Sequence, residues 1–124
     1  MALIMVVDDE KDACRLMQRV LGRLGHEVHA FYDVKSARRW LEDHEPDLVL
    51  LDIKLKDDDG LSILRLLRPH RSAVKVIIIT GFPSAETAQE ARRLGIEDYL
   101  VKPVELEDLE YYVNRALEKR ASVQ

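Results

Sequence analysis

The sequence of 124 residues has a single cysteine, Cys14, which excludes an internal disulfide and is typical of a reducing compartment. The chain also lacks a long apolar run. Its longest runs have about the length of a β-strand, well short of the roughly 20 residues that a membrane span requires. No basic start followed by an apolar stretch marks a signal peptide. These absences predict a cytoplasmic protein without membrane contact.

An excess of positive charge is missing as well. The chain has 19 Lys and Arg residues against 23 Asp and Glu residues, a net charge of −4. Because direct binding of nucleic acid depends on a basic surface, we expect none here. The length is that of one domain with its own core, and we expect a single domain over residues 1–124. The four histidines form no metal-ligand pattern and are interpreted as surface or packing residues.

The sequence does contain short apolar runs that alternate with segments of helical spacing. The runs predict strands over 3–7, 27–31, 47–51, 74–79 and 98–101, with the polar run 27–31 at an edge and the most apolar run, 74–79, in the centre. The first helix is expected over 11–24, with apolar residues at Leu16, Met17, Val20, Leu21 and Leu24. Four later segments also have helical spacing. Their inward residues are Val34, Ala37, Trp40 and Leu41 in the second helix; Leu61, Leu64 and Leu67 in the third; Ala85, Ala88, Ala91 and Leu94 in the fourth; and Leu106, Leu109, Val113 and Leu117 in the fifth.

Crossovers of this length between successive strands require a parallel sheet with right-handed connections and helices on both faces, an α/β fold. Gly25 is expected to end the first helix, and Ser84 to cap the fourth. The polar segment 54–59 predicts a solvated loop, in which Asp59 makes a turn contact before Gly60.

Polar residues stand where four of the predicted strands end: Asp8 and Asp9 after the first, Asp52 after the third, Thr80 after the fourth and Lys102 after the fifth. The carboxyl ends of strands in an open α/β sheet line the ligand crevice, so these side chains are expected together. Three carboxylates in one crevice repel one another, which raises a pKa or recruits a cation, and oxygen ligands suit Mg²⁺. Asp52 would then be both a metal ligand and a nucleophile for a phosphoryl group.

Each of these residues also has a structural interpretation when taken alone. Asp8 and Asp9 are suited to cap the first helix, and Thr80 to cap a later one. Tyr99 alone would be a half-buried aromatic of its strand, and Lys102 a solvated surface lysine. Their joint placement at the ends of separate strands favours a common site.

The same positions carry a resemblance that covers essentially the whole chain. The matching pieces, in order and each after an apolar run, are Val7-Asp8-Asp9-Glu10, Leu51-Asp52, the later Asp59-Gly60, Ile79-Thr80-Gly81 and Asp98-Tyr99-Leu100-Val101-Lys102-Pro103. Together they resemble the receiver domain of bacterial two-component response regulators, including the chemotaxis regulators. The resemblance implies a flavodoxin-like (βα)5 three-layer sandwich with a five-stranded parallel sheet of order 2-1-3-4-5.

The resemblance also implies a signalling module that is not an enzyme beyond its own Mg²⁺-dependent phosphorylation and dephosphorylation. Asp52 would accept a phosphoryl group from the phosphohistidine of a sensor histidine kinase or phosphotransfer protein. Asp9, Asp52 and the backbone carbonyl of Lys54 would hold Mg²⁺, with Asp8 contacting the ion through water.

Three further residues receive roles from the resemblance. Thr80 and Lys102 would follow the phosphoryl group, while the Tyr99 ring turns inward and switches the face formed by the fourth helix, the fifth strand and the fifth helix. The Lys102-Pro103 bond is expected to be cis. The segments 80–83 and 105–117 resemble receivers attached to transcriptional output domains. A homodimer and an attached or separate output domain remain open.

The chain departs from the family after Asp52, where Lys56 replaces a common proline. Lys54 and Lys56 add positive charge beside the site and residues 57–59 add negative charge, so the lifetime of the phosphoryl group is not predicted. Val104 also replaces a frequent aromatic.

Two other classes use related chemistry or a related fold. A haloacid dehalogenase-type phosphatase carries its aspartyl nucleophile in an Asp-x-Asp pair after the first strand, whereas Asp52 follows the third and position 54 is Lys. A flavodoxin must cradle a flavin phosphate in its first loop, which Asp8-Asp9-Glu10 would repel.

Overall fold

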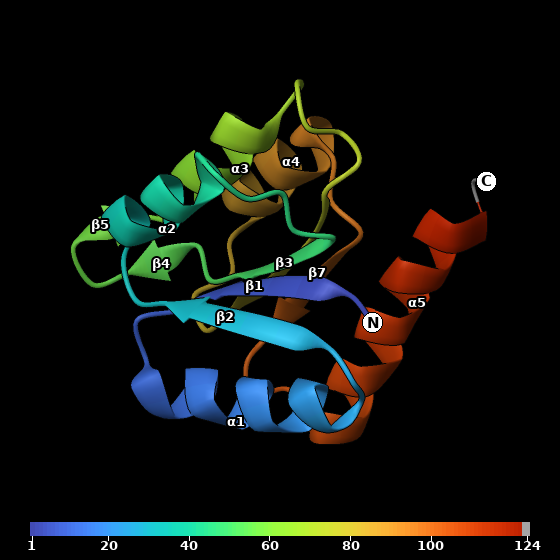
Figure 1. Cartoon of the computed structure of the whole chain (residues 1–124). Helices are drawn as coiled ribbons and strands as arrows, with labels where there is room; N and C mark the ends of the chain where they lie inside the picture. The colour runs from blue at the N-terminus through green and yellow to red at the C-terminus, as the bar shows by residue number, and fades with distance from the viewer. Residues whose placement is uncertain (123–124) are drawn as a thin grey trace.

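Figure 1 shows the protein as a computed structural model that describes residues 1–122; residues 123–124 of the predicted domain lie outside the described residues. In chain order its elements are β1 (Leu3–Val7), α1 (Lys11–Arg23), β2 (Glu27–Phe31), α2 (Val34–Leu41), β3 (Leu48–Leu51), β4 (Lys54–Leu55), β5 (Asp58–Asp59), α3 (Leu61–Leu67), β6 (Lys75–Thr80), α4 (Ala85–Leu94), β7 (Asp98–Val101) and α5 (Leu106–Ser122). Every strand and helix expected from the sequence is present.

The main sheet is parallel and has the order β2-β1-β3-β6-β7. Because the small strands β4 and β5 precede β6 in the chain, this is the predicted order 2-1-3-4-5. The polar strand β2 lies at an edge, as predicted. The most apolar strand, β6, was predicted to be central. It is an interior strand between β3 and β7, and the middle strand of the five is β3. Neighbouring β1 and β3 bring their carboxyl ends side by side.

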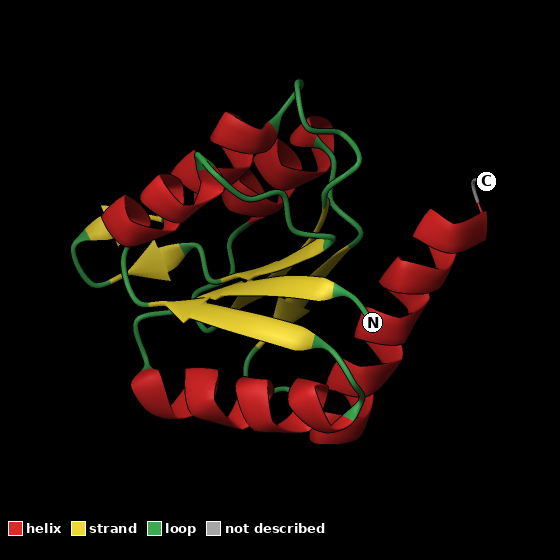
Figure 2. Ribbon diagram, viewed as in Figure 1, coloured by secondary structure: helices red, strands yellow, loops and turns green. Residues whose placement is uncertain are grey.

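Successive residues of each central strand enter two different hydrophobic layers. In β3, Val49 and Leu51 pack with side chains of α2, α3 and α4, whereas Leu48 and Leu50 pack with side chains of α1 and α5. Figure 2 shows these two groups of helices on opposite sides of the sheet. A strand covered on both faces needs apolar residues at every position, which explains the continuous runs in the sequence.

Helix α1 ends near Gly25, as predicted, and Gly25 has a φ of 93°, a conformation that favours glycine. The predicted apolar stripe of this helix is only partly inward, because Leu16 and Leu24 are each 42% exposed. The buried residues are Cys14, Met17, Val20 and Leu21.

Helices α4 and α5 have a shorter buried stripe than predicted. Ser84 caps α4 as expected, its hydroxyl accepting a hydrogen bond from the Thr87 N–H at 3.1 Å. However, Ala85 is exposed and Leu106 is 42% exposed, which corrects their predicted inward positions. Both residues belong to the first turn of a helix that starts at the rim of the sheet, directly after a loop. The packed residues come from later turns, as with Ala88 and Val113.

The segment 54–59 is not the plain loop that its polarity predicts. Strands β4 and β5 pair as an antiparallel hairpin, with Lys54 opposite Asp59. Leu55, 5% exposed, anchors the hairpin to the core, which the polar neighbours concealed in the sequence. The predicted turn contact is confirmed, since the Asp59 carboxylate accepts a hydrogen bond from the Leu61 N–H at 2.9 Å. Residues 57–59 are exposed, as expected.

Candidate functional site

The strand ends bring the predicted site residues to one edge of the sheet. The ladder continues one residue past each strand: the Asp8 N–H donates to the Phe31 carbonyl at 3.0 Å, and the Asp52 N–H to the Val7 carbonyl at 2.9 Å. The Lys102 N–H donates to the Thr80 carbonyl at 2.8 Å. These backbone bonds fix where each side chain leaves the sheet, so Asp8, Asp52 and Lys102 converge.

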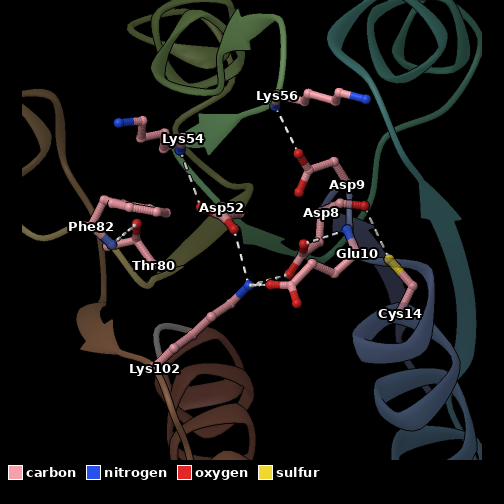
Figure 3. A network of polar contacts seen from close by, with 10 residues as sticks. All are labelled: Asp8, Asp9, Glu10, Cys14, Asp52, Lys54, Lys56, Thr80, Phe82 and Lys102. Atoms are coloured by element: carbon pink, nitrogen blue, oxygen red, sulfur yellow. Dashed lines mark hydrogen bonds and ion pairs between the residues drawn. The ribbon is translucent and has the colours of Figure 1, made fainter.

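The ammonium group of Lys102 forms the centre of this cluster (Figure 3). Its Nζ lies 2.8 Å from Asp8 Oδ2, 3.0 Å from Asp52 Oδ2 and 2.9 Å from Glu10 Oε1. An ammonium group has three N–H donors, so these three carboxylates account for all of them. The prediction that Lys102 belongs to the site, and is not a solvated lysine, is consistent with this geometry.

Burial makes the charges of this cluster interdependent. The side chains of Asp8 and Asp52 are 2% and 6% exposed. Burial raises the pKa of Asp8 above its ordinary value, and the hydrogen bond from Lys102 offsets this only in part. For Lys102, burial alone would lower the pKa, but its hydrogen bonds to Asp8, Glu10 and Asp52 outweigh burial and raise the pKa. Lys102 is therefore a cation, and it is the group that offsets the buried negative charge.

The carboxylate of Asp52 also faces a cleft. Its second oxygen, Oδ1, accepts a hydrogen bond from the Lys54 N–H at 3.1 Å, which orients the group. The cleft has a volume of about 430 Å³, enough for a phosphoryl group. Its walls are Asp9, Glu10, Asp52, Lys54, Leu55, Lys56, Gly81, Phe82 and Lys102.

Asp9 and Glu10 have different surroundings from those the sequence suggested. The Asp9 carboxylate turns to the hairpin and accepts a hydrogen bond from the Lys56 N–H at 2.7 Å, while Glu10 turns to Lys102. Consecutive residues that follow a strand point in different directions, so only the side-chain geometry shows which of Asp9 and Glu10 contacts Lys102. Sequence reasoning included Asp9 and missed Glu10. The only available signal was the run of three acidic residues, 8–10.

A metal ion fits the donor chemistry of this edge. The carboxylates of Asp8, Glu10 and Asp52 each offer an oxygen within 4.8 Å of the others. Carboxylate oxygens are the ligands that Mg²⁺ prefers, and an ion bound by few protein groups keeps several waters. Among residues 1–122, the two buried carboxylates share a single cationic partner, Lys102. This excess of negative charge in a partly buried site favours a divalent cation.

Thr80 and Tyr99 lie beyond the carboxylate cluster. The Thr80 side chain is fully buried, and its Oγ1 accepts a hydrogen bond from the Phe82 N–H at 3.1 Å, so it shapes the loop between β6 and α4. Tyr99 is half-buried against the core, and its hydroxyl lies 2.9 Å from that of Thr87 in α4. Neither side chain has a hydrogen bond to Asp52 among the contacts of residues 1–122.

One smaller expectation is confirmed, and Cys14 has a structural place. The Lys102-Pro103 bond is cis. Cys14 is fully buried, its thiol donates to the Asp8 carbonyl at 3.3 Å, and burial together with nearby Asp8 raises the pKa of Cys14 to about 12. A buried thiol with a raised pKa is a poor nucleophile, and Cys14 packs in the core.

The sheet order and the repeated β-α units define a flavodoxin-like α/β domain with its candidate site at the carboxyl ends of β1 and β3. The model of the response regulator receiver domain matches residues 4–114, and the chain belongs to that family. It is therefore a receiver domain of two-component response regulators. No helix within residues 1–122 is both long and apolar enough to cross a membrane.

Relatives in sequence are longer regulatory proteins. The chain is 36% identical over 115 residues to the regulatory protein AtoC of Escherichia coli K12, an alignment that covers 93% of the chain and 25% of AtoC. It is 32% identical over 116 residues to the DNA-binding transcriptional regulator NtrC of Azospirillum brasilense, covering 94% of the chain and 24% of NtrC. The chain thus spans about a quarter of the length of these curated relatives.

Solved structures agree in fold. The CheY-like receiver domain protein of Methanospirillum hungatei JF-1 matches with a TM-score of 0.95 and 27% identity, covering 100% of this chain and 99% of that one. NtrX of Brucella abortus matches with a TM-score of 0.87 and 37% identity, covering 97% of this chain and 28% of NtrX.

Proposed function

We propose that this receiver domain is switched by phosphorylation of Asp52. One observation carries the proposal: a buried carboxylate at the carboxyl end of the middle strand faces an open cleft and is held by the Lys102 ammonium at 3.0 Å. The cleft gives a phosphodonor access to this carboxylate, which a purely structural role would not require. The phosphatase and flavodoxin alternatives lose their basis, because the chain belongs to the receiver family.

The reaction is a transfer between two covalent carriers. An oxygen of the Asp52 carboxylate attacks the phosphorus of a phosphohistidine in a sensor histidine kinase or phosphotransfer protein. The new O–P bond forms as the P–N bond breaks, and the imidazole nitrogen leaves with the electron pair. The product is an acyl phosphate on Asp52. Because Oδ1 is held by the Lys54 N–H and Oδ2 by Lys102, the carboxylate is already oriented for attack.

Charge neutralisation is the main requirement of this transfer. Asp8, Asp9, Asp52 and the backbone carbonyl of Lys54 would hold Mg²⁺, which when bound neutralises charge on the phosphoryl oxygens. Lys102, whose ammonium group lies 3.0 Å from Asp52 Oδ2, supplies a second positive charge. Thr80, which ends the neighbouring strand β6, would donate its hydroxyl to the phosphoryl group.

The switch would pass through Thr80 and Tyr99. When the Thr80 hydroxyl turns to the phosphoryl group, it gives up the Phe82 N–H, and the loop that leads into α4 changes shape. Tyr99 is hydrogen-bonded to α4 through Thr87, so movement of that helix frees its ring to turn inward. The face formed by α4, β7 and α5 would carry the signal.

The partners follow from the family. We expect the phosphodonor to be a histidine kinase in the cytoplasm, and the output to be a transcriptional domain attached to or separate from this chain, or a homodimer. The curated relatives AtoC and NtrC support an output of that kind, since both are regulatory proteins about four times as long as the matched region. The chain itself has no basic surplus for direct contact with nucleic acid.

The test is intact-mass spectrometry after incubation with acetyl phosphate and Mg²⁺. The parent should gain one phosphoryl group that is labile at high pH. Asp52→Asn should gain none, whereas Asp58→Asn, which changes an exposed aspartate of the adjacent hairpin, should behave like the parent. Phosphorylation of Asp52→Asn at the parent's rate would refute the assignment.

A further inference from the structure

Glu10 makes a contact that its position does not require. It is the N-cap residue of α1, yet its side chain makes no capping hydrogen bond. The side chain is 66% exposed and turns instead to Lys102, with Oε1 at 2.9 Å from Nζ. An exposed glutamate gains little from one ion pair, because water solvates it well. Helix α1 therefore lacks a side-chain N-cap, and the Glu10 carboxylate forms an ion pair with the lysine of the site instead.

Glu10 takes the one donor of Lys102 that the buried carboxylates leave over. Asp8 and Asp52 accept the other two, and both are nearly inaccessible to water. A phosphoryl group that arrives on Asp52 needs a donor from Lys102, so one of the three bonds must open. Giving up Asp8 would leave its Oδ2 without a donor in a buried carboxylate, which is costly, although Oδ1 still accepts a hydrogen bond from the Glu10 N–H at 2.9 Å. Glu10 is exposed, and water can replace Lys102 there.

We propose that Glu10 is a positioning residue that holds the third donor of Lys102 in reserve and competes with the incoming phosphoryl group for it. The proposal rests on the phosphorylation of Asp52 proposed above. It assigns to Glu10 a restraint on the reaction: the site is slower to accept a phosphoryl group than the same site without this carboxylate. Lys102 remains in place when Glu10 is removed, because Asp8 and Asp52 still hold it.

The first test compares Glu10→Gln with Glu42→Gln in the rate of phosphorylation by acetyl phosphate at saturating Mg²⁺. Glu42 is an exposed residue at the C-terminal end of α2. It precedes β3 in the chain, and Asp52 follows the other end of that strand. Both variants lose one negative charge, but only Glu10→Gln weakens a contact with Lys102, because the neutral amide oxygen that remains is a poorer acceptor than the carboxylate. We expect Glu10→Gln to react about two- to fivefold faster than the parent. Glu42→Gln should match the parent. An equal rate for both variants, or a slower reaction of Glu10→Gln, would overturn the proposal.

Glu10→Asp separates the contact from the charge. Aspartate is one methylene shorter and is a favoured N-cap residue, so it should cap α1 and withdraw from Lys102 while keeping the charge. We expect Glu10→Asp to melt at a higher temperature than the parent and to be phosphorylated as fast as Glu10→Gln. A parent-like rate in Glu10→Asp would mean that charge alone acts, and would refute a role through Lys102.

A spectroscopic measurement keeps the contact testable apart from the reaction. The Cε resonance of Lys102 in the unphosphorylated protein should shift in both Glu10 variants and stay unchanged in Glu42→Gln. If Asp52 proved not to be the acceptor, the proposed function would fail while this resonance still reported the contact. An unchanged resonance in both Glu10 variants would show that Glu10 does not hold Lys102.

Discussion

The hydroxyl groups of Thr87 and Tyr99 lie 2.9 Å apart and join α4 to β7. The Tyr99 hydroxyl also accepts a longer hydrogen bond, 3.4 Å, from the Ser84 N–H at the start of the same helix. Farther along, Glu90 of α4 pairs with Arg65 of α3 through two contacts of 2.6 and 3.0 Å. The buried side chains of α4 are the small Ala88 and Ala91, and Leu94 packs partly buried against the core, so polar contacts contribute to the position of this helix.

We therefore predict that α4 responds to activation more than α2 does. Beryllium fluoride with Mg²⁺, which mimics the phosphoryl group, should move the amide resonances of residues 85–94 and of Tyr99 more than those of 34–41. Tyr99→Phe removes the hydroxyl that ties α4 to β7, so it should shift the same α4 resonances without beryllium fluoride. A response that is uniform, or confined to α2, would contradict this face as the output surface.

A second prediction concerns Gly60, which packs against the backbone of the site. A Cβ at this position would collide with the Asp52 carbonyl oxygen and lie 2.8 Å from the Ile53 Cα. Neither backbone atom can move without shifting the strand end that carries Asp52. Gly60→Ala should lower the free energy of unfolding by about 1–3 kcal/mol in urea denaturation and slow the phosphorylation of Asp52.

Gly22 provides the matched control for this substitution. It lies in α1, and a Cβ there would meet no atom within 4 Å. Gly22→Ala should raise the free energy of unfolding by about 0.5 kcal/mol, because alanine favours the helix and restricts the unfolded chain. Equal effects of the two substitutions would show that the close approach at Gly60 does not matter.

A third prediction follows from the raised pKa of Asp8. Burial, only partly offset by Lys102, favours the protonated form in the folded state. The contribution of Asp8 to stability is therefore fully present below its unfolded pKa of about 3.9 and is lost as the pH rises through the folded pKa. Asp8→Asn cannot titrate. Without Mg²⁺, its free energy of unfolding relative to that of the parent should increase as the pH rises above the unfolded pKa of about 3.9. A decrease would mean that Lys102 outweighs burial.

The fourth prediction tests Asp9 as a metal ligand. In the parent, saturation with Mg²⁺ at about 100 times its dissociation constant should stabilise the fold by roughly 2.7 kcal/mol. Asp9→Asn keeps an oxygen acceptor for the Lys56 N–H and removes a charge. It should therefore raise the metal-free melting temperature slightly and lose most of the response to Mg²⁺. A lower metal-free melting temperature with an intact Mg²⁺ response would make Asp9 a structural residue.

The sequence alone was enough to predict the strands, the helices between them and the strand ends that carry Asp8, Asp52 and Lys102, while the order of the strands in the sheet came from the resemblance to receiver domains. Those features depend on local periodicity and on where a polar residue interrupts an apolar run, which are properties of neighbouring residues. The cap at Ser84 could be predicted for the same reason, since a cap bonds within its own first turn.

Other features were decided only by the tertiary structure. Whether Asp9 or Glu10 reaches Lys102 depends on side-chain direction across 92 residues of sequence separation, which no local pattern records. The exposure of Ala85 and Leu106 depends on where the sheet ends beneath each helix. The hairpin at 54–59 forms because Leu55 finds a place in a core that other segments build. Burial and contacts between distant segments are properties of the whole packed chain, and they appear only once the layers come together.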